Sequence, residues 1–350
     1  MRGATGLAVL MTVLAIAPRA AAQAPFVVRD ITAAPGAAAS GTLQVPAAGA
    51  DKGTTIPITI INGTRPGPVL ALVAGTHGME YPPILAVQRL RTAIAPGDLR
   101  GTIVMVHVAN MPSFLGRTIY YSPVDGQNLN RVFPGKAGGT LSERIAHVIT
   151  TEVIERATHV VDIHCGDGNE WLRPYTYWVT TGDPKVAAAG REMALAFGLE
   201  MIVEDTSRPG EPSASVYLSN TAITRGKPAL TVESGAWART DEESIARIER
   251  GVHGLLRHLG MRQTGPAPVQ KPIWIGRNEV LRSSVTGILY PLVEPDRDVP
   301  AGALVARVTD FHGRTLEEIK APFAGRILYV VATPPINAGE PVGFVGEVKQ

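Results

Sequence analysis

From Pro68 onward, short apolar runs alternate with longer stretches in which apolar residues recur every three or four positions. The short runs predict strands at 69–75, 103–109, 160–163, 201–203 and 229–232. The longer stretches predict helices at 82–94, 141–156, 184–197 and 241–259. Strands that alternate with helices indicate an α/β domain with a largely parallel central sheet.

Two of the predicted helices begin with the same polar signature. Thr140 with Glu143, and Thr240 with Glu243, have the spacing of a capping box, in which each side chain accepts a hydrogen bond from the other residue's backbone N–H. These pairs place the amino ends of the helices at 141 and 241.

The residues before this pattern have a different composition. Residues 33–53 are rich in Ala, Gly and Pro, and the runs 42–45 and 55–61 are candidate strands at a sheet edge. We interpret 23–53 as a lead-in segment and 54–265 as the α/β domain.

After a proline-containing linker, the helical period disappears. Residues 285–290, followed by Pro-Ala-Gly at 300–302, recur as 323–329, followed by Asn-Ala-Gly at 337–339. Two similar halves of strands and turns predict a small all-β domain over 272–350, similar to the barrel-sandwich fold of biotinyl carriers. A carrier needs a lysine at the hairpin tip, whereas 309–313 reads TDFHG. We therefore expect a structural or substrate-gating module.

The amino end resembles a secretory signal peptide. Arg2 lies in a short polar lead, an apolar core follows at 7–17, and three alanines at 20–22 predict cleavage after Ala22 in preference to Ala24. A membrane anchor is the alternative, but the core of eleven residues is shorter than the roughly 20 that span a bilayer. The sequence thus predicts an exported protein, periplasmic or secreted, with a signal peptide over 1–22 and no later membrane span.

Charge and cysteine content limit the possible partners and covalent links of the protein. Removal of Arg2 and Arg19 leaves equal numbers of basic and acidic residues, and no basic stripe with interleaved aromatic residues is present. These features argue against a nucleic-acid partner. Cys165 is the only cysteine, so we expect the exported protein to fold without internal disulfides.

Three side chains suited to a metal follow two of the apolar runs. His77 and Glu80 come directly after the strand predicted at 69–75, and His164 ends the strand predicted at 160–163. Because the carboxyl ends of neighbouring parallel strands meet at one crevice, these residues form a candidate His₂Glu site with an open position for water. Cys165 is a weaker candidate, since its side chain points away from that of its neighbour in a strand. For the other histidines we prefer core or surface roles: His107, His147, His159, His253, His258 and His312.

Two further stretches supply polar groups beyond a metal site. The loop DGQNLNRVFPG at 125–135 contains Asn130 and Arg131 and follows Arg117; arginine beside an amide suits a carboxylate or a developing oxyanion. Glu233 ends the apolar run PALTV, where a carboxylate is unusual unless it meets a metal, water or a cation. The alternative for the loop at 125–135 is a solvated surface loop. The alternative for Glu233 is a salt-bridged acid in a turn.

Together these motifs resemble the succinylglutamate desuccinylase and aspartoacylase family, deacylases related to zinc carboxypeptidases. GTHGME, NLNRVFPG, DIH and TVESG occur in the family's order over about 68–237. The resemblance implies that His77, Glu80 and His164 bind one Zn²⁺ per chain, and that Glu233 is the catalytic base.

The same resemblance implies that Arg117 polarises the scissile carbonyl and that Asn130 and Arg131 hold a substrate carboxylate. Two positions depart from the aspartoacylase pattern. A second substrate-binding arginine is expected shortly before the catalytic glutamate, where the nearest is Arg225, and Asn128 replaces a residue that is often acidic.

The predicted function is zinc-dependent hydrolysis of an amide bond in a small N-acyl amino acid or related amide. Two alternatives stay open: an exported metallopeptidase of the carboxypeptidase type, and a non-catalytic zinc- or ligand-binding protein of the cell envelope. The acyl group, the amine and the oligomeric state are not specified by these motifs.

Overall fold

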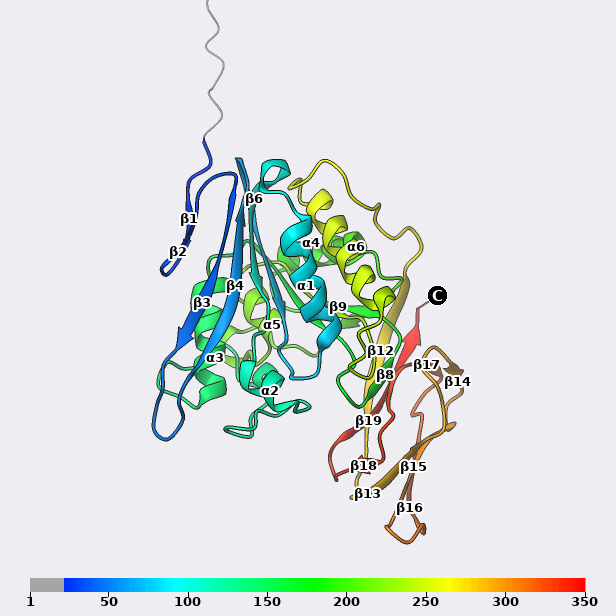
Figure 1. Ribbon diagram of the computed structural model, residues 1–350. Coiled ribbons are helices and arrows are strands. Elements are labelled where there is room, and N and C mark those ends of the chain that lie inside the picture. Colours follow the sequence, from blue (N-terminus) through cyan, green and yellow to red (C-terminus); the bar gives the residue numbers. More distant parts are fainter. Residues whose placement is uncertain (1–21, 350) are drawn as a thin grey trace, which may run out of the picture.

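One broad twisted sheet runs through the molecule and carries helices on both faces (Figure 1). The computed structural model describes residues 22–349, so the predicted signal peptide, apart from its last residue, lies outside the described residues. The strands of this sheet are β3 (Ala37–Val45), β4 (Thr54–Asn62), β5 (Arg65–Ala74), β6 (Arg100–Val106), β7 (His159–His164), β8 (Glu170–Leu172), β9 (Tyr175–Val179), β10 (Met201–Asp205), β11 (Ala229–Glu233), β12 (Ile273–Arg282), β14 (Asp298–Val299), β17 (Gly325–Val331) and β19 (Pro341–Val348). Their spatial order is β14-β17-β19-β12-β10-β9-β11-β7-β5-β6-β4-β3, with β8 beside β17.

The sheet is mixed, so the expectation of a largely parallel sheet is confirmed only in part. β5 is parallel to β6 and β7, β7 is parallel to β11, and β9 and β12 are parallel to β10. β9 nevertheless runs antiparallel to β11, and β4 runs antiparallel to β3 and β6. The connections explain this, because only Gly63 and Thr64 separate β4 from β5 and no helix separates β7 from β9. A parallel partner requires a crossover of about a dozen residues or more.

Within residues 22–349, six α-helices surround the sheet: α1 (Tyr81–Ala93), α2 (Met111–Gly116), α3 (Leu141–Ile149), α4 (Pro184–Phe197), α5 (Leu218–Ile223) and α6 (Glu242–His258). Alternate residues of β5 show which helices cover each face of the sheet. Leu70 and Leu72 pack into a core with α1, α4 and α6, whereas Ala71 and Val73 pack into a core with α3 and α5. A strand buried on both faces reads as a continuous apolar run, which is why it was recognisable in the sequence.

The amino ends of α3 and α6 can be compared with the two predicted capping boxes. The capping box of Thr140 and Glu143 is confirmed at α3, but that helix ends at Ile149 and continues as a single π-helical turn, Thr150–Ile154. The second predicted box is wrong. Asp241 caps α6 by accepting a hydrogen bond from the backbone N–H of Ser244, which moves the cap one residue along the chain.

The short elements are the hairpin β1 (Phe26–Val28) and β2 (Ile31–Ala33), and the 3₁₀ turns Pro96–Asp98, Leu129–Arg131 and Pro212–Ala214. None of the helices within residues 22–349 combines the length and apolar character that a membrane crossing requires.

The carboxyl-terminal strands do not form an isolated domain sheet. A four-stranded sheet contains β16 (Thr315–Lys320), β15 (Leu304–Thr309), β13 (Gly287–Pro291) and β18 (Pro335–Ile336), in that order. β12, β14, β17 and β19 instead extend the large sheet, because β12 pairs with β10 of the α/β part. The two halves of the sequence repeat thus fall in different sheets, with β13 in the small one and β17 in the large one. The module is fastened along the edge of the α/β part, beside the ends of the central strands (Figure 1).

Candidate active site

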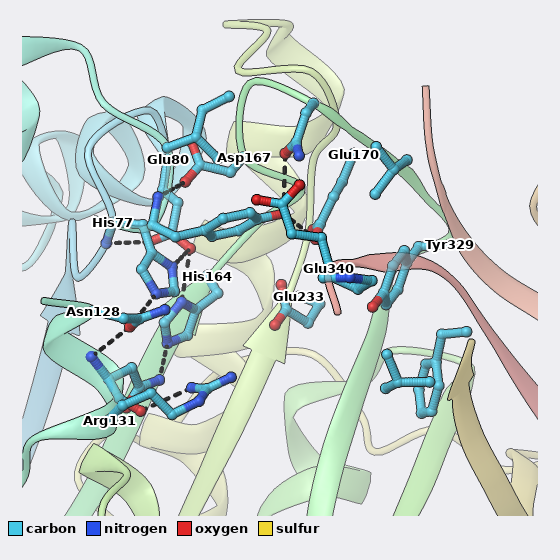
Figure 2. Close-up of a pocket in the computed structure, with 18 of the residues that line it drawn as sticks. His77, Glu80, Asn128, Arg131, His164, Asp167, Glu170, Glu233, Tyr329 and Glu340 are labelled. Carbon is cyan, nitrogen blue, oxygen red and sulfur yellow. Dashed lines mark hydrogen bonds and ion pairs between the residues drawn. The ribbon is translucent and has the colours of Figure 1, made fainter. Parts of the chain in front are cut away.

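Three predicted metal ligands meet at the carboxyl ends of two neighbouring strands. Ala74 of β5 pairs with Ile163 of β7, so the residues that follow them lie close together. The Nδ1 atom of His77 lies 2.9 Å from Oε1 of Glu80, and Nδ1 of His164 lies 2.7 Å from the same oxygen (Figure 2). One possible ligand atom from each side chain falls within 4.8 Å of the other two.

Gly78 allows the turn that carries the first two ligands. A Cβ atom at this position would lie 2.3 Å from the backbone oxygen of Ser113, so any side chain would push the loop away from α2. The glycine of the sequence motif is therefore explained by a close backbone approach.

The outer nitrogens of both imidazoles have polar partners. Nε2 of His77 lies 3.2 Å from Oδ1 of Asn128, and Nε2 of His164 lies 2.9 Å from a carboxylate oxygen of Asp162. When Nε2–H donates to these oxygens, each Nδ1 keeps a free lone pair that faces Glu80. Asn128, which departs from the family pattern, thus orients a candidate ligand through its amide oxygen.

The ionisation of the three side chains depends on their proximity. Burial by itself would raise the pKa of Glu80, but His164 and His77 hold it well below its ordinary value. Burial opposes protonation of His164, yet Asp162 and Glu80 raise its pKa well above the usual range. Two imidazole nitrogens and one carboxylate oxygen, all at most 9% exposed, form a donor set of the kind that binds zinc. The residues present therefore fit a divalent cation.

Glu233 stands beside this cluster. It pairs with His164 across the parallel strands β11 and β7, and both side chains line one cavity of about 850 Å³. Burial raises the pKa of Glu233 well above its ordinary value, although His164 opposes this shift. Within residues 22–349 Glu233 forms no salt bridge. A half-buried carboxylate that faces a cavity next to a candidate cation site has the position of a general base.

Asn130 and Arg131 also line the cavity, but their side chains make different contacts. The amide of Asn130 contacts Nε2 of His164 at 3.2 Å and accepts a hydrogen bond from the backbone N–H of Leu218 at 2.9 Å. Arg131 lies over the ring of Tyr217, 4.6 Å from its centroid, and has no carboxylate partner within the described residues. Arg131 is therefore available to an anionic ligand, whereas the amide of Asn130 is occupied within the protein.

Arg117 lies elsewhere. It is exposed, it ends α2 in a left-handed backbone conformation, and it is not among the residues that line the cavity. The turn that follows brings Tyr120 to the cavity instead, where its ring meets His77 edge to face and its hydroxyl donates to Glu170 at 2.5 Å. The structure thus gives no support to the predicted role of Arg117 at the scissile carbonyl.

Arg208 is a cavity arginine that the sequence did not reveal. Its Nε donates to Asp205 at 2.6 Å, its guanidinium lies 3.5 Å from the centroid of Tyr217, and its Nη1 is buried without a hydrogen-bond partner in the described chain. Arg225, the arginine nearest to Glu233 in the sequence, donates to the backbone oxygen of Thr221 and does not line the cavity. Arg208 follows β10 in an irregular loop, where no periodic pattern marks a functional residue.

Cys165 lines the cavity but does not join the cluster of possible ligand atoms. Its thiol donates to the backbone oxygen of Gly166, and burial raises its pKa well above the ordinary value. A thiol in this state is a poor metal ligand, since the thiolate is the binding form.

The pH dependence of stability should report the acids of this cavity in the metal-free protein. Burial raises the pKa of Glu170 from an ordinary 4.5 to about 7. The folded protein then holds a proton that the unfolded chain releases, so stability from this group is present below about pH 4.5 and is lost as pH rises toward 7. We expect the melting temperature of chelator-treated wild type to fall more between pH 5 and pH 8 than that of Glu170→Gln. Equal falls in both proteins would contradict this assignment.

Comparison with known proteins agrees with this fold. The family model for the succinylglutamate desuccinylase/aspartoacylase catalytic domain matches residues 66–259, which is more than half of the chain. A curated relative, N-alpha-acetyl-L-2,4-diaminobutyric acid deacetylase of Halomonas elongata, is 29% identical over 301 residues, covering 84% of this chain and 86% of its own. The fold is a mixed α/β sheet that carries a His-Glu-His cluster able to hold a metal ion. This chain belongs to the succinylglutamate desuccinylase/aspartoacylase family.

Solved structures show the same architecture over nearly the whole chain. The product-bound ectoine utilization protein EutE (DoeB) of Ruegeria pomeroyi is 26% identical, with a TM-score of 0.79 over 93% of this chain and 98% of that one. A succinylglutamate desuccinylase/aspartoacylase of Rhodobacter sphaeroides is 25% identical, with a TM-score of 0.77 over 89% of this chain and 96% of that one. The carboxyl-terminal β module is therefore part of the shared fold.

Proposed function

We propose that this protein is a zinc-dependent hydrolase that cleaves the amide bond of a small N-acyl amino acid. One observation carries the proposal: a single cavity is lined by the His-Glu-His cluster and by Glu233 and Arg131, neither of which has an ion-pair partner within residues 22–349. One ion per chain would be held by His77, Glu80 and His164. The curated relative supports the reaction class, because its name describes a deacetylase of an N-acetyl amino acid.

The chain's own residues account for binding and proton transfer. Arg131 and the unpartnered Nη1 of Arg208 flank Tyr217 and together suit a substrate carboxylate. Bound zinc would supply Lewis acidity toward the scissile carbonyl and lower the pKa of water toward about 7. Glu233 takes a proton from the attacking water and returns it to the nitrogen as the C–N bond breaks, which yields a carboxylate and an amine. Asn130 donates to Asp162, the carboxylate that accepts from Nε2–H of His164, and is therefore a positioning residue.

The cavity wall favours a small substrate over a peptide chain. The carboxyl-terminal module contributes lining residues from both β17 and the segment before β19, including Tyr329, Pro335 and Glu340. Tyr329 and Glu340 lie on the side of the cavity away from Arg131 (Figure 2). This wall argues against the metallopeptidase alternative. A protein that only binds a ligand has no need of a base such as Glu233, which has no ion-pair partner within the described residues.

A panel of N-acyl amino acids and short peptides, offered to zinc-loaded and chelator-treated protein, tests the proposal. We expect hydrolysis of small N-acyl amino acids that chelation abolishes and added zinc restores. Hydrolysis of peptides alone would favour the metallopeptidase, and zinc binding without turnover on any amide or ester would favour the binding protein.

We also propose export, from the signal-peptide pattern of residues 1–22. The mature chain recovered from its native host should begin at Gln23, which mass spectrometry of the intact protein will show. Leu14→Arg places a charge in the apolar core and should leave the precursor uncleaved in the cytoplasm, whereas the same change at the exposed Leu115 should not affect processing. A mature protein that retains Met1 would refute the proposal.

A further inference from the structure

Aromatic side chains line the cavity from Glu233 to the carboxyl-terminal module. Glu233 of β11 pairs with Tyr175 of β9, and the centroid of the Tyr175 ring lies 6.2 Å from that of Phe344 on β19. The rings of Tyr177 and Tyr329 contact the same phenylalanine, with centroids 6.2 and 5.8 Å away. All of these side chains line the cavity. The module thus supplies part of the surface next to the proposed base.

Aliphatic side chains of the module extend this aromatic surface. Val280 of β12 pairs with Phe344 of β19, which also pairs with Tyr329 of β17, so the three side chains form one row across adjacent strands. Val331 follows Tyr329 by two positions and points to the same face of β17. Ile336 of β18 lines the cavity together with these four. We call the surface formed by these five side chains the apolar wall.

Polar side chains near the apolar wall are bonded within the protein or lose their charge. Asn278 and Arg282 donate hydrogen bonds to backbone oxygens. Glu340 accepts hydrogen bonds from the backbone N–H and the side-chain amide of Asn337, at 2.8 and 3.2 Å. Burial raises the pKa of Glu170 to about 7, so its neutral form is populated at neutral pH. An apolar group can therefore cover the wall without burying these groups unpaired.

The cavity is larger than an acetylated amino acid requires. Its volume is about 850 Å³. Cavities of roughly 300–1,000 Å³ accommodate drug-sized ligands, whereas an acetylated amino acid has only about ten non-hydrogen atoms. Such a molecule, with its carboxylate at Arg131 and its amide at the His-Glu-His cluster, would leave the apolar wall in contact with water. A longer apolar group that covers the wall would remove that surface from water and bind more tightly.

The geometry of the amide bond directs the acyl group toward this wall. A secondary amide is trans, so its acyl chain and the carbon that carries the carboxylate lie on opposite sides of the C–N bond. When Arg131 holds the carboxylate, the acyl chain points away from Arg131. Figure 2 shows Tyr329 on that side of the cavity. The side chain of the amino acid branches from the same carbon as the carboxylate and stays nearer to Arg131.

We propose that the apolar wall is the acyl subsite, and that the natural substrate carries an apolar acyl group longer than acetyl, such as a medium-length fatty acyl chain. This assignment rests on the proposed function and narrows its substrate class. Water adds to the carbonyl carbon and the C–N bond breaks, so the products are a medium-chain carboxylic acid and a free amino acid. The chain would then differ from the curated relative, whose name specifies an acetyl group. Val280 and Phe344 act as specificity-determining residues contributed by the module.

Two isomeric substrates test the placement of the acyl group. N-butyrylalanine and N-acetylnorvaline each have two methylene groups more than N-acetylalanine, the first in the acyl group and the second in the amino-acid side chain. We expect kcat/KM to rise about fourfold for each methylene added to the acyl group, the usual gain on burial, and to rise further for N-hexanoylalanine. N-acetylnorvaline should stay within twofold of N-acetylalanine. Equal kcat/KM for all acyl lengths, or a larger gain for N-acetylnorvaline than for N-butyrylalanine, would overturn the proposal.

Val280→Phe locates the subsite, because Val280 is half-buried and a larger ring there would occupy the space above the wall. We expect kcat/KM for N-hexanoylalanine to fall at least tenfold and kcat/KM for N-acetylalanine to stay within twofold of wild type. Glu279→Phe is the matched control, since it adds the same ring to β12 at an exposed position that does not line the cavity. Both values should then stay at the wild-type level. Equal losses on the two substrates in Val280→Phe, or no loss on either, would refute the placement.

Val280→Thr covers the case in which Val280→Phe does not fold. It keeps the branched shape of the side chain but makes the wall more polar, so the ratio of kcat/KM between N-hexanoylalanine and N-acetylalanine should fall severalfold. An unchanged ratio in this variant would count against the subsite.

Direct binding separates this inference from the proposed function. If zinc-loaded wild type hydrolyses none of these compounds, the deacylase proposal fails, and calorimetric titration of the same compounds into the same protein still decides the subsite. Tighter binding of N-hexanoylalanine than of N-acetylalanine, lost in Val280→Phe or reduced in Val280→Thr, supports an apolar subsite; equal affinities exclude it.

Discussion

Glu233→Gln is expected to lower kcat by about 10²–10⁴, the usual contribution of a general base, while zinc content and fold stay close to wild type. The variant keeps the size and the hydrogen-bonding shape of the side chain but cannot accept the proton. Because burial holds the pKa of Glu233 high, the neutral amide should also be tolerated at this position without loss of stability.

The measurement is single-turnover and steady-state hydrolysis by folded, zinc-loaded protein, with elemental analysis of each preparation. Glu279→Gln is the matched control, because Glu279 is exposed on β12 and is offset by one residue from the cavity-lining Asn278 and Val280. It should keep wild-type kcat. Activity of Glu233→Gln within a few-fold of wild type would remove Glu233 from the mechanism, and joint loss of metal and fold would indicate a structural role.

The parts of this site that were predictable are those set by buried strands and short local motifs. β5 and β7 are buried on both faces, so their apolar runs identify them, and parallel neighbours must end at the same edge. His77, Glu80 and His164 follow those ends directly. Glu233 was recognisable for the same reason, since it ends β11 in register with His164.

Residues on irregular segments could not be placed in this way. Arg208 reaches the cavity because Asp205 and Tyr217 hold its guanidinium, and these contacts join positions with no common period. Arg117 precedes the Asn-Arg pair in the sequence, but its backbone is left-handed and Tyr120, three residues later, lines the cavity instead. Sequence proximity is a weak guide in loops, where a single backbone conformation decides which side chain faces the site.

The hydrophobic pattern also could not predict the direction of the strands. An apolar run predicts a buried strand, but it does not specify whether the strand is parallel to its neighbour. The connection lengths contain that information. The absence of a helix between β7 and β9 already requires a reversal, and the reversal brings Tyr175 beside Glu233.

Loss of the metal is expected in both His77→Ala and His164→Ala, because each removes one of three donor atoms that lie within 4.8 Å of one another. Elemental analysis should give about one zinc per chain for wild type and less than about a tenth of that for either variant, since removal of a mere supporting partner already costs 10- to 100-fold in affinity. Cys165→Ser should keep the metal, because the thiol is turned to the backbone oxygen of Gly166. Retention of zinc by His164→Ala together with its loss from Cys165→Ser would show that the ligand assignment is wrong.

The stability of the same two variants should differ when all proteins are compared without metal. His164 pairs with Asp162, which is fully buried, whereas the outer partner of His77 is the neutral amide of Asn128. His164→Ala therefore leaves a buried carboxylate without its closest partner, a loss of about 3 kcal/mol, whereas His77→Ala leaves no unpaired charge. In chelator-treated protein we expect His164→Ala to unfold at clearly lower denaturant concentration than His77→Ala, and the double variant His164→Ala, Asp162→Asn to recover part of the difference. If the two single variants unfold together, Asp162 does not depend on His164, and its role in orienting that ligand would have to be abandoned.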